Sequence, residues 1–465
     1  MPASPIDIYE LLTRELGSRR VLRDEERLEA YSHDESGLGR FPPAAAVLCE
    51  SAAEVSLVLR LAREHRVPVT PRGTGTGMTG GALAVQGGIV LSTERMNQVL
   101  AIDEQDLLAV VEPGVITGVL QEQVEAVGLF YPPDPASLES CSLGGNVAEN
   151  AGGPRAFKYG VTRRYTLGLE LALMGGERLR CGRRTVKGVT GYDVVATVVG
   201  SEGTLAVATE ITLRLLPQPP AVQTMLAAMP DVVSAGVAVT SILRAGEPPR
   251  ALEIIDGVTV DHLRRKESPY RFPAGAGAVV LCELDGHPES LEAAMLRAAA
   301  ACAAAGAVDV FVAKDESERR AIWQTRRNAS PALKELHRSK TAEDIVVPLG
   351  RIPEMLGRIA AISARHGITI GTFGHAGDGN LHVNLVHDED EADPAVRARV
   401  QAAIDDLFRA TLALGGTLSG EHGIGLAKRD HVAWEQTPEL IGFQQRLKRV
   451  FDPDGLLNPG KKIPQ

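Results

Sequence analysis

The chain has 465 residues, a formal net charge of -10 at pH 7, 44% hydrophobic residues and 23% charged residues. This length exceeds what one ordinary hydrophobic core organises, so we expect two or more domains in a compact globular protein. The acidic charge and the lack of a block of consecutive basic residues argue against nucleic-acid binding.

The five cysteines are scattered, and no two of them form a C-x-x-C pair. This spacing argues against a thiolate zinc site, an iron–sulfur cluster within the chain and a disulfide framework. It favours a reducing, cytoplasmic setting.

The N-terminal stretch 1–17 predicts an amphipathic helix with Ile6, Ile8, Leu11 and Leu12 on its apolar side. It lacks the basic and then apolar layout of a signal peptide. No apolar run approaches the roughly 18–20 residues that a membrane helix needs. We therefore expect no transmembrane segment, and peripheral membrane contact only through a partner.

Between residues 20 and 217, short β-branched stretches alternate with amphipathic stretches and many glycines. Apolar residues at helical spacing predict helices at 51–65 and 116–128. The β-type patterns predict strands within 44–50, 68–73, 87–92, 107–114 and 203–217. The prolines that follow mark a domain boundary at Pro217, Pro219 and Pro220.

Beyond this boundary, helical and strand patterns alternate in a way that indicates an α+β domain. Helices are predicted at 230–246 and 287–306, the second rich in alanine, and strands at 250–256 and 276–286. The segment 447–461 predicts a helix, a DPDG turn and an extended tail that folds back on the first domain.

A glycine cluster fills the stretch VPVTPRGTGTGMTGGAL. Gly75, Gly77 and Gly80 satisfy the G-x-G-x-x-G fingerprint of Rossmann folds, which requires a helix to begin within the glycines. The following stretch 82–92 has a β-type pattern instead, so the Rossmann context is lacking. The backbone N–H groups of such a loop can still converge on a diphosphate, and a plain surface turn is the alternative.

Two further clusters of small and amide-bearing residues follow, at 132–162 and 191–217. They lack periodicity, which suits a backbone that wraps a large polar ligand better than a packed element. A ligand that contacts three separate clusters in one domain must be large, and FAD has a suitable size.

The motifs PRGTGTGMTGGA, PPDPAS, GGNVAENAGG, KGVTGYD and GSEGTL resemble those of flavoproteins of the vanillyl-alcohol oxidase and p-cresol methylhydroxylase (PCMH) type. The resemblance runs from Tyr31 to Lys461. Later motifs narrow it to the branch that contains the glycolate oxidase catalytic subunit, cytochrome-linked D-lactate dehydrogenase and D-2-hydroxyglutarate dehydrogenase.

This resemblance implies an α+β fold with three parts. The first is a two-subdomain FAD-binding domain of the PCMH type at 1–218. The second is an α+β cap domain of the FAD-linked oxidase C-terminal type at 219–424, which carries the substrate and a metal site. The third is a C-terminal segment, 425–465, that returns to the FAD domain at NPGK.

The resemblance also implies a set of FAD-binding residues. By motif they are Arg72, Gly73, Thr74, Gly75, Thr76, Thr79, Gly80, Gly81, Pro133, Asp134, Ser137, Ser142, Gly144, Gly145, Asn146, Asn150, Glu202, Gly203 and Asn458. We expect noncovalent FAD, because relatives that bind flavin covalently often carry a histidine in the first loop, and this loop has none.

Two histidines lie in the stretch GTFGHAGDGNLHVNLVH, which predicts a strand, a Gly-Asp-Gly turn and a second strand. This arrangement places His382 and Asn384 on one face and can bring His375 near His382. Two imidazoles with a carboxylate can hold a catalytic metal and leave positions open for substrate. From the residues alone, however, a hydrogen-bonded structural histidine is the better interpretation.

The resemblance reverses this preference. It implies a zinc-type site made by His375, His382 and Glu421, with manganese or iron as alternatives, and it makes His422 the catalytic base. In the implied reaction the metal holds the substrate carboxylate and C2 hydroxyl, and His422 takes the hydroxyl proton. The C2 hydrogen passes as hydride to the flavin, which leaves a 2-oxo acid.

The substrate carboxylate also needs a cation. The stretch IWQTRRNAS predicts a helix with two arginines, for which a solvated face is the alternative. The resemblance favours Arg326, with Ser330 one turn on, and Asn384 as a further hydrogen-bonding residue. Some relatives have a lysine just before EDIVVP, where this chain has Ala342 with Lys340 nearby, and this weakens the case for a dicarboxylate.

The implied function is an FAD-dependent dehydrogenase of a D-2-hydroxy acid, with D-lactate or glycolate favoured, that passes electrons to an acceptor other than NAD. The alternatives are a D-2-hydroxyglutarate dehydrogenase, an oxidase that uses oxygen, and the flavin subunit of a multi-subunit glycolate oxidase that is inactive alone. Candidate acceptors are an electron-transfer flavoprotein, a quinone, a cytochrome or an iron–sulfur subunit. A homodimer is a candidate too, since dimers are common in the group.

Overall fold

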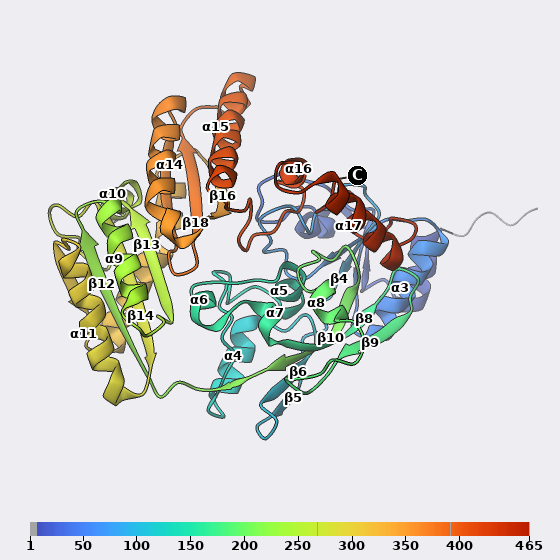
Figure 1. Cartoon of the computed structure of the whole chain (residues 1–465). Helices are drawn as coiled ribbons and strands as arrows, with labels where there is room; N and C mark the ends of the chain where they lie inside the picture. Colours follow the sequence, from blue (N-terminus) through green and yellow to red (C-terminus); the bar gives the residue numbers. More distant parts are fainter. Residues whose placement is uncertain (1–6, 267, 391, 465) are drawn as a thin grey trace, which may run out of the picture. The chain divides into compact units, whose positions relative to one another are not determined.

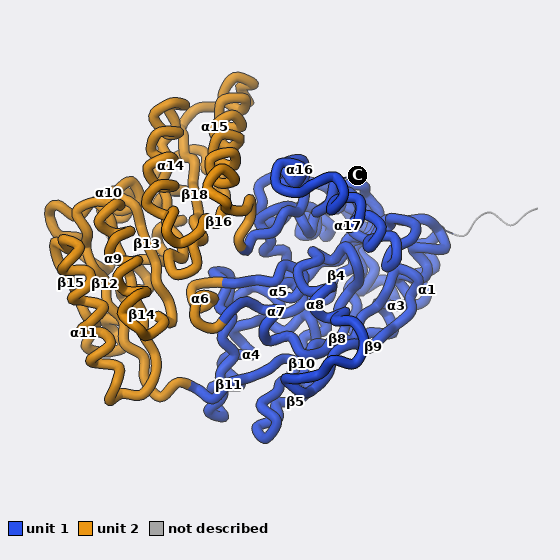
Figure 2. Tube along the Cα trace, in the orientation of Figure 1, with its two compact units in different colours: residues 1–152, 160–218, 421–465 blue, residues 153–159, 219–420 orange. Residues whose placement is uncertain are grey.

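The computed structural model describes residues 7–266, 268–390 and 392–464. The chain folds into two compact units, which Figure 2 shows in different colours. Unit 1 comprises residues 1–152, 160–218 and 421–465, and unit 2 comprises residues 153–159 and 219–420. The short segment 153–159 therefore leaves the first unit and joins the second.

The described residues of unit 1 form two larger sheets and one two-stranded sheet. The first has the strand order β1-β2-β4-β3, in which β4 pairs in parallel with β2 and β3. The second has the order β5-β6-β10-β8-β9 and is antiparallel throughout. The strands are β1 (Val21–Leu22), β2 (Ala45–Leu48), β3 (Val69–Arg72), β4 (Ile89–Ser92), β5 (Val99–Asp103), β6 (Leu108–Val111), β8 (Thr166–Ala172), β9 (Arg178–Gly182) and β10 (Val207–Arg214), with a separate pair β7 (Leu129–Phe130) and β11 (Leu216–Pro217).

The burial of these strands follows their sequence patterns. Strands β2 and β4 are buried at every position, as expected for strands covered on both faces. Strand β10 alternates buried and half-buried residues, the period of a strand with one face in the core. The predicted strands of the first domain are thus confirmed, with boundaries shifted by a few residues.

The helices of unit 1 bury apolar stripes against these sheets. Helix α3 begins at Ser51, whose hydroxyl accepts the amide hydrogen of Glu54, and it places Val55 and Val58 in a core shared with β2, β3 and β4. Of the N-terminal helix, Ile8 and Leu12 lie in the same core, and Ile6 lies outside the described residues. The helices are α1 (Ile8–Leu16), α2 (Glu25–Leu28), α3 (Ala52–Glu64), α4 (Thr117–Glu125), α5 (Leu143–Glu149), α7 (Thr162–Tyr165), α8 (Val194–Val198), α16 (Val432–Glu435) and α17 (Pro438–Phe451).

Unit 2 is built on one seven-stranded antiparallel sheet with the order β15-β12-β14-β13-β17-β18-β16. The strands are β12 (Ala221–Met229), β13 (Ala251–Asp256), β14 (Ala278–Gly286), β15 (Asp309–Val312), β16 (Ser339–Val346), β17 (Thr369–His375) and β18 (Asn380–His387). The helices are α6 (Ala156–Tyr159), α9 (Val232–Arg244), α10 (Gly257–Arg265), α11 (Pro288–Ala304), α12 (Glu316–Arg327), α13 (Ala329–Glu335), α14 (Ile352–His366) and α15 (Pro394–Ala413).

Helices cover both faces of this sheet (Figure 1). Buried residues of α9, α11, α14 and α15 form one core with the sheet, and residues of α10, α12 and α13 form a second core on the opposite face. Leu252, Leu381 and Val383 face the first core. Because side chains alternate along a strand, the neighbouring Glu253 and His382 face the second side, which carries the polar residues of interest.

Several sequence predictions can be compared directly with these elements. The predicted hairpin is confirmed, since β17 and β18 pair antiparallel across a short turn. The rejection of a Rossmann fold is confirmed as well, because residues 81–88 form turns that lead into β4 and no helix. Together with the two larger sheets of unit 1, the α+β fold class is confirmed.

The prediction that one helix carries both Arg326 and Ser330 is wrong. Helix α12 ends at Arg327 and α13 begins at Ala329. A continuous helix would need the N–H of residue 331 to reach the carbonyl of Arg327, and Pro331 has no N–H. Separately, no helix within the described ranges is long and apolar enough to cross a membrane.

The C-terminal segment joins unit 1 through a buried carboxylate. Asp452 follows α17, is fully buried, and accepts hydrogen bonds from the amides of Leu456 (3.1 Å) and Leu457 (2.8 Å). It also pairs with Lys448 at 2.5 Å. Leu457 then bridges to Val69 of β3, so this carboxylate fixes the chain's return to the first sheet.

We predict that Asp452→Asn lowers the free energy of unfolding by about 2–3 kcal/mol, because the Lys448 ammonium loses its buried partner charge. Chemical denaturation followed by circular dichroism measures this difference. Asp454→Asn is the matched control, since its bridge to Arg63 (2.8 Å) is partly exposed and such pairs contribute below about 1 kcal/mol. Equal losses in the two variants would contradict the prediction.

Candidate functional site

Unit 1 contains a cavity whose wall is formed largely by small residues. Glycines from all three sequence clusters line it, namely Gly73, Gly75, Gly77, Gly81, Gly144, Gly145, Gly152 and Gly203. The other predicted cofactor residues on this wall are Arg72, Thr74, Thr76, Ser137, Ser142, Asn146 and Glu202. Clusters that lie far apart in the sequence therefore border one space.

The first glycine loop is held in shape by Arg72. Its Nη1 donates to the carbonyl of His33 (2.8 Å) and its Nη2 to that of Ala30 (3.1 Å). Gly75 has a φ of +77°, and a Cβ at this position would overlap the guanidinium of Arg72. At Gly77 a Cβ would meet no atom within 4 Å. The fold therefore requires glycine at position 75 and tolerates a side chain at position 77.

The second cluster contributes polar side chains to the wall. Ser142 caps α5 by accepting the amide hydrogen of Gly145 (3.2 Å), and the amide of Asn146 donates to the hydroxyl of Thr117 (2.7 Å). Oε2 of Glu149 is shielded from solvent and accepts no hydrogen bond from the described residues. Burial, and after it the neighbouring Glu202, raises the pKa of the Glu149 carboxyl well above its usual range.

This wall fits a large polar cofactor such as FAD. Glycine leaves backbone N–H groups open to a ligand, because no Cβ stands in front of them. A shielded carboxyl oxygen without a partner, as at Glu149, is rare in folded proteins, and a polar ligand in the cavity would supply the missing hydrogen bond.

Glu202 holds the loop that follows the predicted base. Glu202 has a backbone φ of +54°, and its side chain is buried. Oε1 accepts the amide hydrogen of Ile424 (2.9 Å), Oε2 accepts that of Gly425 (2.7 Å), and Lys462 pairs with Oε1 at 2.9 Å. Both carboxylate oxygens thus bind the loop and the C-terminal segment.

His422 and Glu421 lie on this loop and line the cavity of unit 1. Thr79 fixes the same loop from the first glycine cluster, since its hydroxyl donates to the carbonyl of His422 (3.1 Å). Its own carbonyl accepts the amide hydrogen of Leu426 (2.7 Å). The predicted base is therefore carried by a loop that Thr79 and Glu202 hold within the same unit as the cavity.

The remaining predicted cofactor residues lie outside the cavity lining; they are Thr79, Gly80, Pro133, Asp134, Asn150 and Asn458. Asn458 connects two lining segments, because its amide donates to the carbonyls of Gly81 (3.1 Å) and Glu202 (2.7 Å). Lys461 donates to the carbonyl of Gly81 as well (3.0 Å), and burial lowers its pKa to about 7. The assignment of these residues to the cofactor stays a prediction.

In unit 2, the two predicted histidines point at each other across the β17–β18 hairpin. Nε2 of His375 and Nε2 of His382 lie 3.4 Å apart, and both side chains are buried. Two nitrogens bound to one tetrahedral zinc at about 2.05 Å would lie about 3.3 Å apart. The spacing of this pair therefore fits two ligands of one metal ion.

Glu253 of β13 sets the tautomer of His375. Its Oε1 lies 2.6 Å from Nδ1 of His375, and its Oε2 accepts a hydrogen bond from Nε of Arg326 (2.7 Å). A carboxylate only accepts, so Nδ1 carries the hydrogen and Nε2 presents its lone pair. Burial opposes the ionisation of Glu253, but His375 and Arg326 outweigh it and hold the pKa below its usual value.

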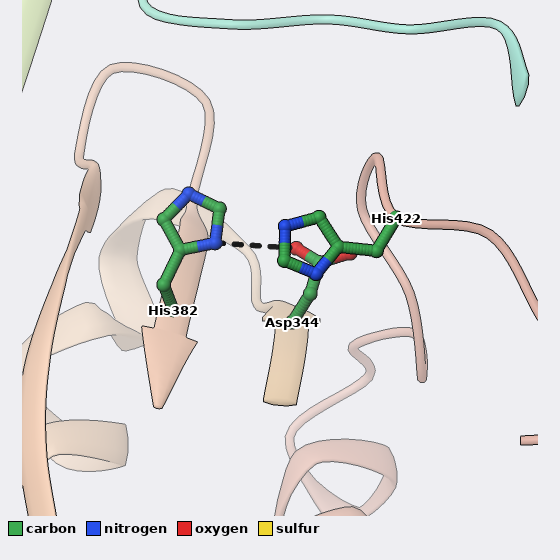
Figure 3. Close-up of side chains that lie close together, drawn as sticks. All are labelled: Asp344, His382 and His422. Atoms are coloured by element: carbon green, nitrogen blue, oxygen red, sulfur yellow. Dashed lines mark ion pairs between the residues drawn. The ribbon is translucent and has the colours of Figure 1, made fainter. Parts of the chain in front are cut away.

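Asp344 of β16 lies on the other side of His382. Figure 3 shows the ion pair between Oδ1 of Asp344 and Nδ1 of His382, at 3.9 Å. Oδ2 of Asp344 accepts hydrogen bonds from the hydroxyl of Ser419 (3.0 Å) and the amide of Gly420 (2.8 Å). The chain continues from Gly420 directly into Glu421, which belongs to unit 1.

The predicted substrate residues lie on the same side of this sheet. Arg326 ends near Phe373, with its guanidinium carbon 4.6 Å from the ring centre, and it is tied to Glu253. The hydroxyl of Ser330 contacts the ammonium of Lys340. Burial, and then Lys334, lowers the pKa of Lys340 to about 8. Asn384 instead donates to the carbonyls of Gly371 (3.3 Å) and His382 (3.1 Å).

Glu253 and Asp344 were not among the predicted site residues. Each sits in a stretch that reads as an ordinary strand, and each is fully buried. A charged residue within an apolar strand is rare without a partner, which is the signal that could have found them. Glu149 lies within a motif already singled out, GGNVAENAGG, and was passed over there.

Two family models match the chain, and each of them covers mainly one of the two units. Residues 43–182 match the FAD binding domain, and residues 218–462 match the C-terminal domain of FAD linked oxidases. The chain is 41% identical over 431 residues to glycolate oxidase subunit GlcD of Bacillus subtilis, which covers 93% of this chain and 91% of that protein. It is 34% identical over 455 residues to D-lactate dehydrogenase of Anaerostipes hadrus, with 96% and 95% covered.

A solved structure agrees in fold. The crystal structure of p-cresol methylhydroxylase with substrate bound superposes with a TM-score of 0.80 at 17% identity and covers 98% of this chain and 96% of that chain. This likeness concerns the fold alone, and with the family matches it confirms the PCMH-type resemblance inferred from the motifs. The chain belongs to the family of FAD linked oxidases and is an FAD-dependent oxidoreductase.

Proposed function

We propose that the chain oxidises a D-2-hydroxy acid, with D-lactate or glycolate favoured, to the 2-oxo acid. The names of its relatives support a small hydroxy acid, since one is a glycolate oxidase subunit and another a D-lactate dehydrogenase. The observation that carries the proposal is the buried pair His375 and His382, with facing Nε2 atoms and Glu253 on the far nitrogen of His375. Two facing imidazoles can hold a metal ion, and such an ion can bind the carboxylate and the C2 hydroxyl of a 2-hydroxy acid.

We assign a divalent metal to His375, His382 and Glu421, with zinc favoured and manganese or iron as alternatives. When bound, such a metal supplies Lewis acidity that lowers the pKa of a hydroxyl group it holds. Glu253 keeps the Nε2 lone pair of His375 available, and Asp344 offers negative charge beside His382.

We assign noncovalent FAD to the cavity of unit 1, whose first glycine loop contains no histidine to form a covalent link. When bound, FAD supplies the two-electron acceptor for the hydrogen on C2 of the substrate. His422 takes the proton of the C2 hydroxyl on its imidazole. Its loop stays in place because Glu202 accepts two of the backbone N–H groups that follow.

Arg326 binds the substrate carboxylate. Its Nε is used by Glu253, and within the described ranges its Nη atoms make no hydrogen bond, so both remain for a carboxylate. Ser330 and Asn384 are the further polar residues that we assign to the substrate. Electrons then leave to an acceptor other than NAD, for which an electron-transfer flavoprotein, a quinone, a cytochrome and an iron–sulfur subunit are the candidates.

A second candidate function is that of a flavin subunit that turns over only within a larger complex. The relative with 41% identity is named as a subunit of glycolate oxidase, and this favours it. In that case substrate still reduces the flavin of the isolated chain, and only steady-state turnover requires the partner.

The test of the proposed function is anaerobic reduction of the purified yellow protein by D- and L-2-hydroxy acids, followed at the flavin band near 450 nm. We expect rapid bleaching by D-lactate or glycolate with zinc present, and no bleaching by L-lactate. Bleaching by D-2-hydroxyglutarate and by none of the other acids would replace lactate or glycolate with D-2-hydroxyglutarate as the proposed substrate. A protein that contains FAD and is bleached by none of these acids would contradict the proposal.

A pair of glycine variants tests the FAD assignment. Gly75→Ala should lower FAD affinity at least about tenfold, because the left-handed backbone is strained by a Cβ that also displaces Arg72. Gly357→Ala is the control and should leave it unchanged, since this residue lies on α14 of unit 2, outside the cavity lining, and its Cβ meets no atom within 4 Å. The quenching of flavin fluorescence on titration with apoprotein measures both. Full FAD binding by Gly75→Ala would remove this loop from the cofactor site.

Histidine variants separate the metal from the base. His382→Ala should lose both zinc and turnover, whereas His422→Ala should keep zinc and FAD and lose at least about 100-fold in turnover. His387→Ala, on the same strand β18, is the control and should retain zinc. Zinc content by elemental analysis and flavin spectra are the readouts. Full activity of metal-stripped wild-type protein would rule out the metal.

A further inference from the structure

One buried carboxylate in unit 2 joins two residues with different proposed tasks. Glu253 is fully buried on β13 and has both oxygens engaged, Oε1 with Nδ1 of His375 at 2.6 Å and Oε2 with Nε of Arg326 at 2.7 Å. His375 lies on the adjacent strand β17, directly opposite Glu253 in the register, whereas Arg326 reaches it from α12. One side chain is therefore shared between a histidine of the strand pair and an arginine of the covering helix.

We propose that Glu253 is a positioning residue that holds the metal ligand His375 and the substrate-binding Arg326 in their working geometries at the same time. This inference rests on the proposed function, which assigns the metal to His375 and the substrate carboxylate to Arg326. It goes beyond that assignment because the positions of His375 and Arg326 then both depend on a third residue, which binds neither metal nor substrate.

The sharing follows from the donors involved. Nδ1–H of His375 and Nε–H of Arg326 are both donors, and they bind different oxygens of the Glu253 carboxylate, Oε1 and Oε2. With Nδ1 bound to Glu253, the lone pair of Nε2 points to Nε2 of His382, 3.4 Å away. With Nε bound to Glu253, the guanidinium of Arg326 lies over the ring of Phe373, and its two Nη atoms are not used by Glu253. An amide in the same position would replace one of these two oxygens by an NH2 group, which is itself a donor and would face one of the two N–H groups.

Glu283 on the neighbouring strand β14 supplies a matched control. It is buried like Glu253 and accepts hydrogen bonds from Trp323 (2.6 Å) and Thr224 (2.7 Å), with an ion pair to Arg250 (3.1 Å). None of these partners belongs to the proposed metal or substrate set. Loss of this carboxylate tests what the removal of any buried charge does to unit 2.

The experiment uses the FAD-loaded full chain, stripped of metal and titrated with zinc against a chromophoric chelator. We expect Glu253→Gln to raise the zinc dissociation constant about 10- to 100-fold, the range for lost partners of metal-binding histidines. At saturating zinc it should also raise KM for the acid that bleaches the wild type, with a smaller change in kcat. Glu283→Gln should lower the unfolding temperature and change neither constant more than about twofold.

Glu253→Asp covers the case in which the glutamine variant does not fold. It retains the charge but is shorter by one C–C bond, about 1.5 Å, so it cannot reach both donors and should again raise the zinc constant and KM. A folded variant that keeps both the wild-type zinc dissociation constant and the wild-type KM would overturn the inference. A variant in which only one of these two constants changes would show that Glu253 does not hold both His375 and Arg326. Wild-type protein that binds no zinc yet is bleached by substrate would instead reject the metal in the proposed function, and the inference with it.

Discussion

A carboxylate inside an apolar sheet is stable only when cations or hydrogen-bond donors surround it, and this constraint organises the polar face of unit 2. Glu253 and Asp344 are both fully buried, on strands that place Leu252, Ile254 and Ile345 in the apolar core. Their partners are His375, Arg326 and His382. The groups that stabilise the carboxylates are the same groups that we assign to chemistry, so the stability of this face and its function cannot be varied separately.

Unit 1 meets the opposite requirement, because its cavity must present backbone and few side chains. A wall of glycines has little packing of its own and needs support from behind. Asn458 and Lys461 supply it by binding the carbonyls of the first glycine cluster, and Glu202 does so for the loop of His422. The C-terminal segment is anchored in turn by Asp452. This explains why the end of the chain returns to the sheet with which the domain begins.

Local patterns were enough to predict most of the elements and the glycine clusters that line the cavity of unit 1. The hairpin that carries His375 and His382 could be predicted because its turn and its alternation lie within one stretch of sequence. Its apolar strand marks Glu253 as a buried charge that needs partners, but these partners could not be predicted, because the contact with His375 depends on β13 lying next to β17, more than a hundred residues away in the chain. The strand order of an antiparallel sheet leaves no mark in the strands themselves. It could likewise not be predicted that segment 153–159 belongs to the second unit, because its sequence looks like a continuation of the glycine clusters.

The balance of charge on the polar face bears on which acid the protein oxidises. The negative charges of Glu253 and Asp344 are matched by Arg326 and Lys340, and the pKa of Lys340, about 8, leaves it largely protonated at pH 7. In the metal site that we propose, a divalent ion together with Glu421 would add one net positive charge to this set. A monocarboxylate cancels that charge, whereas a dicarboxylate leaves one negative charge without a partner, and an uncompensated charge away from water is costly. Within the function that we propose, this balance of charge is a reason to favour lactate or glycolate over 2-hydroxyglutarate, which would need one more cation than these residues supply.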